Sequence, residues 1–194
     1  SYFDRKGRDL LRIDSCDLLE ESFTLHGDLA KAALLSYIAE IVDTFSRERE
    51  ADPRYFRLLT SVMGAVREGV DVAMLARYFE VWTLKLHGLF PSLSRCDSCG
   101  RDVSACGGYL TVAEMPRFTC PSCGGREPSK CVAVSARAIT LLGQIRTLAP
   151  ADLTRLRPDR VALEEMEKAA VAMLNAFVGH PFRSYRFLRE VRAL

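Results

Sequence analysis

Four cysteines have the spacing of a metal site. They form two C-x-x-C pairs, and a glycine follows the second cysteine of each pair: Cys96, Cys99 and Gly100, then Cys120, Cys123 and Gly124. Each pair closes a tight turn that points two thiolates at one ion, and the glycine lets the backbone curl so that its N–H groups face the sulfurs. The spacing therefore predicts a tetrahedral zinc site with four cysteine ligands. Two disulfides, or four free thiols in a helical core, are the alternatives.

The remaining cysteines argue against an oxidising compartment. The chain has seven cysteines, an odd number, so pairing alone cannot satisfy them. Cys16 lies in an apolar stretch and is predicted to be a small core residue, whereas Cys106 and Cys131 flank the metal loop without a C-x-x-C partner. A reducing environment favours zinc over disulfides at the four paired cysteines.

The sequence favours a binding protein over an enzyme. Four thiolates close the zinc shell, whereas a catalytic zinc keeps an open position for water. The chain contains no H-E-x-x-H, no H-x-E beside a C-x-x-C pair, no P-loop lysine motif and no G-x-S-x-G. A zinc hydrolase or a redox protein is the enzymatic alternative. The segment from Cys120 to Cys123 has the form of a redox dithiol, but no βαβ pattern surrounds it.

Composition and charge are those of an ordinary globular chain. Of the 194 residues, 48% are apolar, and no run approaches the roughly 18 uninterrupted apolar residues of a membrane span. The first residues are too charged for a signal peptide, so we expect a cytoplasmic protein. The net charge is only +2, but the charges are unevenly distributed along the chain. Residues 1–94 carry 12 basic and 15 acidic side chains, whereas residues 95–194 carry 15 basic and 10 acidic side chains. A polyanion partner would therefore meet the second half of the chain.

The apolar spacing predicts a mainly α-helical fold. Apolar residues recur at steps of three and four through 29–46, 53–68, 71–87, 136–150, 159–178 and 183–194, and a short helix is expected from Ser15 to Phe23. Residues 91–131 interrupt this pattern with glycine, serine, proline and the four cysteines, which predicts a zinc-ribbon-like insertion that its metal holds together. Residues 1–13 have the pattern of a short β-hairpin. We expect a helical bundle domain over residues 14–194, with the insertion inside it and the hairpin remnant before it.

Three segments resemble the family of the bacterial recombination mediator RecO. The first leads from an apolar helix into the first cysteine pair: Phe79-Glu80-Val81-Trp82-Thr83-Leu84-Lys85-Leu86-His87-Gly88-Leu89, then Pro91, then Arg95-Cys96-Asp97-Ser98-Cys99-Gly100. The second and third are the knuckle Cys120-Pro121-Ser122-Cys123-Gly124 and the closing segment His180-Pro181-Phe182-Arg183-Ser184-Tyr185-Arg186-Phe187-Leu188. The resemblance covers nearly the whole chain.

The resemblance implies a non-catalytic role in recombinational DNA repair, at the bacterial nucleoid. Members of the family bind single- and double-stranded DNA, anneal complementary strands, engage the C-terminal tail of single-strand-binding protein and act with RecR to load recombinase. Many members have lost zinc cysteines, which implies a structural metal. Members also carry an N-terminal OB-fold barrel, and residues 1–13 fit only its last strands. Because the chain begins at Ser1 rather than Met, we expect a fragment or a naturally short form.

Arginines near the C-terminus are the main candidates for contact with DNA. No acidic residue occurs between Lys168 and Arg189, and Arg183, Arg186 and Arg189 recur every third residue, which places them on one face of a helix. Guanidinium groups on such a face can bind phosphates or stack on bases. The alternative is that the helix docks on the core while its arginines are solvated or paired with acids.

Other surfaces are weaker candidates. The hairpin remnant carries a second basic group, which consists of Arg5, Lys6, Arg8 and Arg12. The tail of single-strand-binding protein is acidic and apolar, so it would need an apolar cleft between helices with arginine at its rim. The main rival to a DNA-binding mediator is a zinc-stabilised adaptor that binds only proteins. Salt dependence separates the two, because phosphate contacts weaken as the salt concentration rises.

Overall fold

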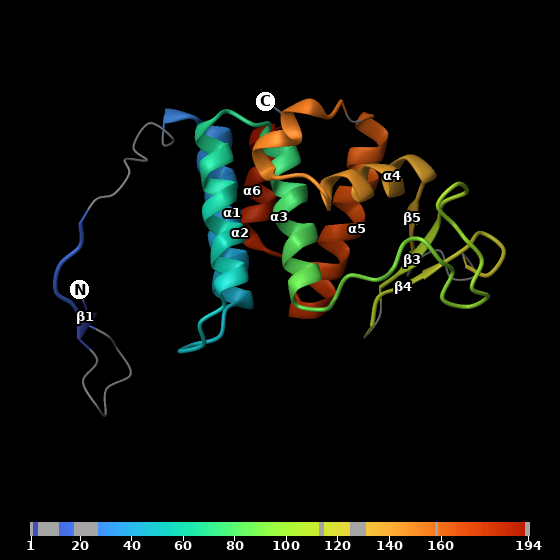
Figure 1. Ribbon diagram of the computed structural model, residues 1–194, viewed down its shortest axis with the longest axis horizontal. Coiled ribbons are helices and arrows are strands. Elements are labelled where there is room, and N and C mark those ends of the chain that lie inside the picture. Colours follow the sequence, from blue (N-terminus) through green and yellow to red (C-terminus); the bar gives the residue numbers. More distant parts are fainter. Residues whose placement is uncertain are drawn as a thin grey trace.

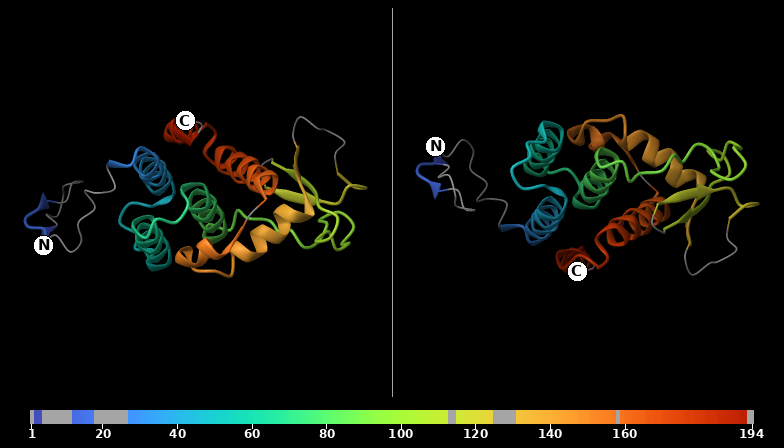
Figure 2. Two further views of the ribbon diagram at one scale, coloured as in Figure 1. Left: turned by 90° about the horizontal axis from the view of Figure 1, so that it is seen from above. Right: turned by 90° about the horizontal axis from the view of Figure 1, so that it is seen from below.

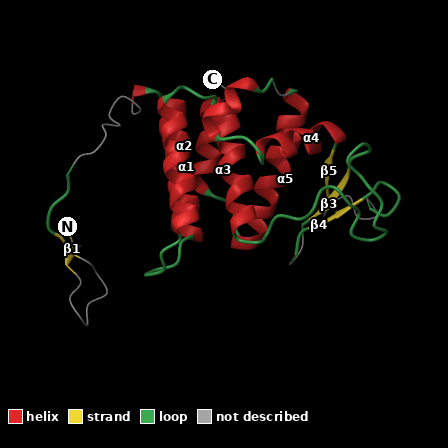
Figure 3. Cartoon of the chain, viewed as in Figure 1, coloured by secondary structure: helices red, strands yellow, loops and turns green. Residues whose placement is uncertain are grey.

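The computed structural model describes residues 2–3, 12–17, 27–112, 115–124, 131–157 and 159–192. Its helices are α1 (Leu29–Phe45), α2 (Pro53–Arg67), α3 (Val72–Leu86), α4 (Ala136–Ile145), the 3-10 helix η3 (Pro150–Arg155), α5 (Arg160–Val178) and α6 (Arg183–Arg192). An antiparallel sheet of order β4-β3-β5 contains β3 (Gly108–Thr111), β4 (Arg117–Thr119) and β5 (Cys131–Val134). Figure 3 shows the helices gathered in one body with this sheet at one end. The mainly α fold with a zinc-ribbon-like insertion between helices is as predicted.

Aspartates fix where the first helices begin. Asp28 accepts hydrogen bonds from the backbone N–H groups of Ala30 and Lys31, and Asp52 caps α2 in the same way with Pro53 at the first helical position. Asp71 caps α3 through the N–H of Met74. These side chains satisfy donors that have no partner inside the helix. None of the helices in the described parts of the chain is both long and apolar enough to cross a membrane.

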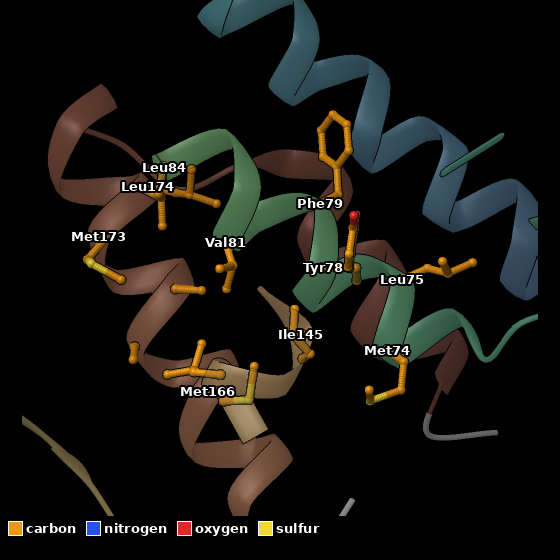
Figure 4. Close-up of a cluster of buried hydrophobic side chains, with 14 of the residues drawn as sticks. Met74, Leu75, Tyr78, Phe79, Val81, Leu84, Ile145, Met166, Met173 and Leu174 are labelled. Carbon is orange, nitrogen blue, oxygen red and sulfur yellow. The ribbon is translucent and has the colours of Figure 1, made fainter. Parts of the chain in front are cut away.

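Helix α3 forms the centre of the helical body. Viewed along the helices, it lies in the middle with the other helices around it (Figure 2), and it packs against α1, α2, α5 and η3 (Figure 1). Eleven of its 15 residues are buried. Figure 4 shows Val81 and Leu84 of α3 facing Met166, Met173 and Leu174 of α5. Tyr78 and Phe79 of this helix are therefore core residues, as the apolar spacing of residues 71–87 predicts.

The N-terminal segment is described only in part. Strand β1 (Tyr2–Phe3) pairs antiparallel with β2 (Arg12–Ile13), so the predicted hairpin is confirmed. Residues 14–17 are irregular, and the rest of the helix expected up to Phe23 lies outside the described residues, as do Arg5, Lys6 and Arg8. The prediction of a buried Cys16 is wrong. Residues 13–17 are all exposed, so nothing among the described residues covers its thiol.

Candidate metal centre and basic surfaces

The four predicted ligands lie together beside the sheet. The sulfur atoms of Cys96, Cys99, Cys120 and Cys123 all lie within 4.8 Å of one another, and Sγ of Cys99 is 3.8 Å from Sγ of Cys120. Zinc–sulfur bonds of about 2.3 Å at tetrahedral angles place sulfur atoms about 3.8 Å apart, whereas a disulfide needs about 2.05 Å. All four cysteines are free. The arrangement can hold one metal ion, and it contradicts the disulfide alternative.

Backbone hydrogen bonds close both knuckles. The N–H of Gly100 donates to the carbonyl of Cys96 at 2.8 Å, and the N–H of Gly124 donates to that of Cys120 at 2.9 Å. Gly100 has φ +72°, in the left-handed region that favours glycine. At Gly124 the constraint is steric, because the Cβ atom of any other residue would lie 2.2 Å from Oγ1 of Thr119. Both glycines thus serve the ligand turns, for different reasons.

The thiols have unequal proton affinities. Hydrogen bonds from backbone N–H groups, that of Cys120 first, lower the pKa of Cys96 to about 6. The neighbouring sulfurs, that of Cys120 first, raise the pKa of Cys123 to about 12. Four thiolates this close repel one another, and a divalent cation removes that repulsion by binding them all. The donor set and its amide surroundings therefore fit a thiolate-bound metal ion.

The metal module is continuous with the helical core. Leu110 of β3 and Val134 of β5 are buried against Met166 of α5. Ser135 follows β5, donates its N–H to Glu165 of α5 at 2.8 Å and caps α4 through its hydroxyl. The sheet includes β5, which the sequence did not predict as a strand, so the module reaches α4 without a flexible connection.

Helix α6 is docked at its N-terminus by a glutamate of α1. The carboxylate of Glu40 accepts hydrogen bonds from the N–H of Arg183 at 3.0 Å, the N–H of Ser184 at 2.8 Å and the Ser184 hydroxyl. Partial burial raises the pKa of Glu40, but these hydrogen bonds outweigh it and hold the pKa below its usual value. Phe182 and Leu188 are buried beneath the helix. The side chains of Arg183 and Arg186 therefore take no part in docking the start of the helix on the core.

The three predicted arginines of α6 are all exposed. Arg186 forms an ion pair with Glu190 on the same helix at 2.9 Å, and Nε of Arg189 lies 4.0 Å from Glu167 of α5. Exposed pairs of this kind contribute little to stability. The arginines are thus available to a partner, with Arg189 nearest to α5.

A buried polar network, which sequence analysis missed, links four helices. Arg77 and Glu80 of α3 are fully buried and paired, and Tyr37 of α1 donates its hydroxyl to Glu80 at 2.8 Å. Arg77 also reaches Glu167 of α5 at 2.8 Å, and Glu167 accepts from the Tyr185 hydroxyl of α6 at 2.7 Å. Arg192 completes this network, 3.0 Å from Glu167. The sequence offered one signal for this pair: Arg77 and Glu80 lie three residues apart between apolar residues of the same helix.

A groove between α2 and α3 joins aromatic and basic side chains. Its volume is about 300 Å³, and we call it the α2–α3 groove; it is lined by Arg54, Arg57, Leu58, Ser61, Tyr78, Trp82 and Leu86. Lys85 lies over the ring of Trp82, 4.1 Å from its centroid. The walls are apolar and aromatic, and the charges that line the groove are positive. The groove therefore combines apolar and aromatic walls with arginine at its rim.

Fold and site together define a helical domain with an integral four-cysteine metal module and exposed arginines on its last helix. Residues 26–186 match the family described as Recombination protein O C terminal. The chain therefore belongs to this family, the C-terminal domain of RecO.

Three relatives, each described as DNA repair protein RecO, show how far the similarity extends. The chain is 28% identical over 185 residues to that of Moorella thermoacetica, covering 95% of this chain and 68% of the relative. The chain is 30% identical over 192 residues to the protein of Anaeromyxobacter sp. (strain K), and the match covers 98% of this chain and 74% of the relative. It is 35% identical over 102 residues to the protein of Koribacter versatilis, and that match covers 53% of this chain and 41% of the relative. The chain thus matches only part of each relative's length.

Proposed function

We propose that this chain is part of a non-catalytic mediator of recombinational DNA repair. In this role it binds DNA and single-strand-binding protein, promotes strand annealing and acts with RecR to load recombinase, in the bacterial cytoplasm at the nucleoid. Membership of the RecO C-terminal family carries the proposal. The relatives' description as DNA repair proteins supports it. The hairpin of residues 1–13 would be the end of an OB-fold barrel.

We propose zinc as the metal, in a structural role. Thiolate ligands in a tetrahedral set select zinc over the oxygen-preferring magnesium and calcium. Cys96, Cys99, Cys120 and Cys123 would supply all four ligands, so no coordination position remains for a water nucleophile. The metal thus holds the module in place and takes no part in a reaction.

The outer arginines of α6 are the proposed DNA contacts. Arg183 and Arg186 are exposed, and Phe187 between them and Arg189 is 42% exposed, which offers a ring on which a base can stack. We expect Arg183→Glu/Arg186→Glu to weaken binding of single-stranded and duplex DNA about ten-fold and to flatten its salt dependence, because two phosphate contacts are lost. Fluorescence anisotropy of labelled oligonucleotides across a salt series measures both effects.

The matched control for this variant is Arg47→Glu/Arg54→Glu. Both residues are exposed arginines at the junction of α1 and α2, and each pairs with an acid as Arg186 does. The control makes the same change in net charge away from α6. Equal loss in both variants would indicate a general charge effect. DNA binding that is insensitive to salt and to the α6 variant would favour the adaptor that binds only proteins.

The α2–α3 groove is the proposed site for the tail of single-strand-binding protein. Arg54 and Arg57 can pair with acidic residues of the tail, while Trp82 and Leu86 cover its apolar end. We expect Arg57→Glu to weaken binding of a synthetic tail peptide at least ten-fold, because charge attraction at the rim becomes repulsion. Trp82 is the only tryptophan, so its emission reports the peptide directly if the peptide lacks tryptophan.

Arg101→Glu on the metal module is the control, since it makes the same charge change at an exposed arginine outside the groove. A peptide that binds both variants with wild-type affinity and leaves the Trp82 emission unchanged would exclude this groove.

A further inference from the structure

A second basic groove, distinct from the outer arginines, lies between the last two helices. Its volume is about 410 Å³, and we call it the α5–α6 groove; it is lined by Arg160, Glu164, Glu167, Lys168, Tyr185, Arg189 and Arg192. Every one of these side chains is polar. The two helices lie beside each other in both views of Figure 2. The groove is thus suited to a charged, hydrated ligand and not to an apolar peptide.

The charges of the groove favour an anion. Four cations and two acids line it, which leaves an excess of positive charge. The buried pair of Arg77 and Glu80 beneath the groove adds one charge of each sign and leaves this excess unchanged. Both acids already have partners, because Glu164 pairs with Arg160 at 3.0 Å and Glu167 with the buried Arg77 at 2.8 Å. Lys168 is exposed and forms no ion pair among the described residues. The groove therefore offers positive charge that its own acids do not neutralise.

Glu167 positions the cationic wall of the groove in advance. Burial raises the pKa of Glu167, but Arg77, the Tyr185 hydroxyl and Arg192 outweigh burial and hold the pKa below its usual value, so the carboxylate is ionised at neutral pH. It holds Arg192 at 3.0 Å and leaves that side chain only 26% exposed. An arginine fixed in this way loses less conformational entropy when it binds an anion.

The row of arginines on α6 leads into this groove. Successive residues of an α-helix turn by about 100°, so the face drifts from Arg183 through Arg186 to Arg189. Arg189 lines the groove, whereas Arg183 and Arg186 do not. A strand that contacts the outer arginines can therefore continue past Arg189 into the space between the helices.

We propose that the α5–α6 groove binds the sugar–phosphate backbone of a DNA strand, an inference that rests on the proposed DNA-binding function. Arg189 and Arg192 donate N–H groups to phosphate oxygens, and Lys168 provides a point charge on the opposite wall. The contacts read no base, so binding is independent of sequence. The groove extends the DNA contact from α6 to α5.

Two substitutions with opposite expected effects test the groove. Lys168→Gln removes an exposed charge without touching the network of Glu167, and it should weaken DNA binding several-fold. It should also reduce the slope of log affinity against log salt by about 0.7 for single strands and about 0.9 for duplex. Glu164→Gln removes an acid that competes with phosphate for Arg160, and it should tighten binding, which a misfolded variant cannot imitate. Anisotropy with the intact chain and oligonucleotides of several sequences measures each effect.

The control variants are Lys31→Gln on α1, where the lysine pairs with Asp28, and Glu50→Gln on the α1–α2 loop, where the glutamate pairs with Arg47. Both should leave the affinity for DNA unchanged. If Arg183→Glu/Arg186→Glu weakens binding while Lys168→Gln and Glu164→Gln behave as their controls, the groove is not used, and the outer arginines stand as the DNA contact. If the wild-type chain binds no DNA even at low salt, the proposed DNA-binding function fails and the groove with it. Binding that depends on base sequence would contradict the backbone contact alone.

Discussion

Cys120→Ser is expected to release the metal and unfold the module between α3 and α4. Cys120 is 1% exposed and lies at the end of β4, where its carbonyl also accepts the hydrogen bonds that close the second knuckle. Structural zinc contributes about 10–16 kcal/mol in small domains, which is comparable with the stability of a whole protein of about 5–15 kcal/mol. The module has few apolar residues of its own, so it has no other source of stability of this size.

The damage should extend into the helical body. Leu110 and Val134 belong to the module but pack on α5, so unfolding the module exposes one side of that helix. We expect the metal content to fall from stoichiometric to near zero, together with a lower midpoint of thermal unfolding. Metal analysis under reducing conditions measures the first and circular dichroism the second. Amide hydrogen exchange should show lost protection in β3 to β5 before α1.

Cys106→Ser is the control for Cys120→Ser. Cys106 is exposed, belongs to the same module and lies outside the metal-ligating set, so its replacement should leave both metal content and stability unchanged. A Cys120→Ser variant that keeps stoichiometric metal and wild-type stability would show that the tetrad is not the metal site.

Local signals explain what the sequence predicts well. The ligand set is visible because both members of each knuckle lie within four residues, and the geometry of a turn depends on its own residues. The helices are visible because their apolar spacing and their caps, such as Asp52 before Pro53, are also local. Zinc itself, the DNA contacts and the division into domains remain predictions, because no local pattern fixes them.

The features that the sequence did not reveal depend on packing between distant elements. Glu40 lies 143 residues before Arg183, yet it caps α6, and Glu167 on α5 takes up Arg192. The absence of acidic residues near the arginines in the sequence therefore suggested that α6 has fewer acidic neighbours than the structure shows. Strand β5 forms because β3 offers it a hydrogen-bonding partner. Its four residues, Cys131 to Val134, are too few for their pattern to distinguish a strand from a helix or a loop.

Arg77→Met is expected to destabilise the helical body by about 3–5 kcal/mol at pH 8. The substitution keeps much of the side-chain volume but removes the cation that joins Glu80 to Glu167, and a buried charge left without its partner costs about that amount. Urea unfolding measures the loss. Arg47→Met after α1, an exposed arginine whose surface pair with Glu50 contributes little, is the control and should change stability by less than about 0.5 kcal/mol.

The cost of Arg77→Met should also depend on pH in a definite direction. Burial raises the pKa of Glu80 to about 7, against the lowering effects of Arg77 and the Tyr37 hydroxyl, and loss of Arg77 raises it further. The folded variant then binds a proton that the unfolded chain has released above its ordinary pKa of 4.5, so the stability of the variant falls as the pH rises. We expect the difference in free energy of unfolding between the variant and the wild type to be smaller at pH 5 than at pH 8.

The double variant Arg77→Met/Glu80→Leu removes both charges and should recover most of the stability at pH 8. A difference that does not change with pH, or a double variant no more stable than Arg77→Met, would show that the pair is not what holds these helices together.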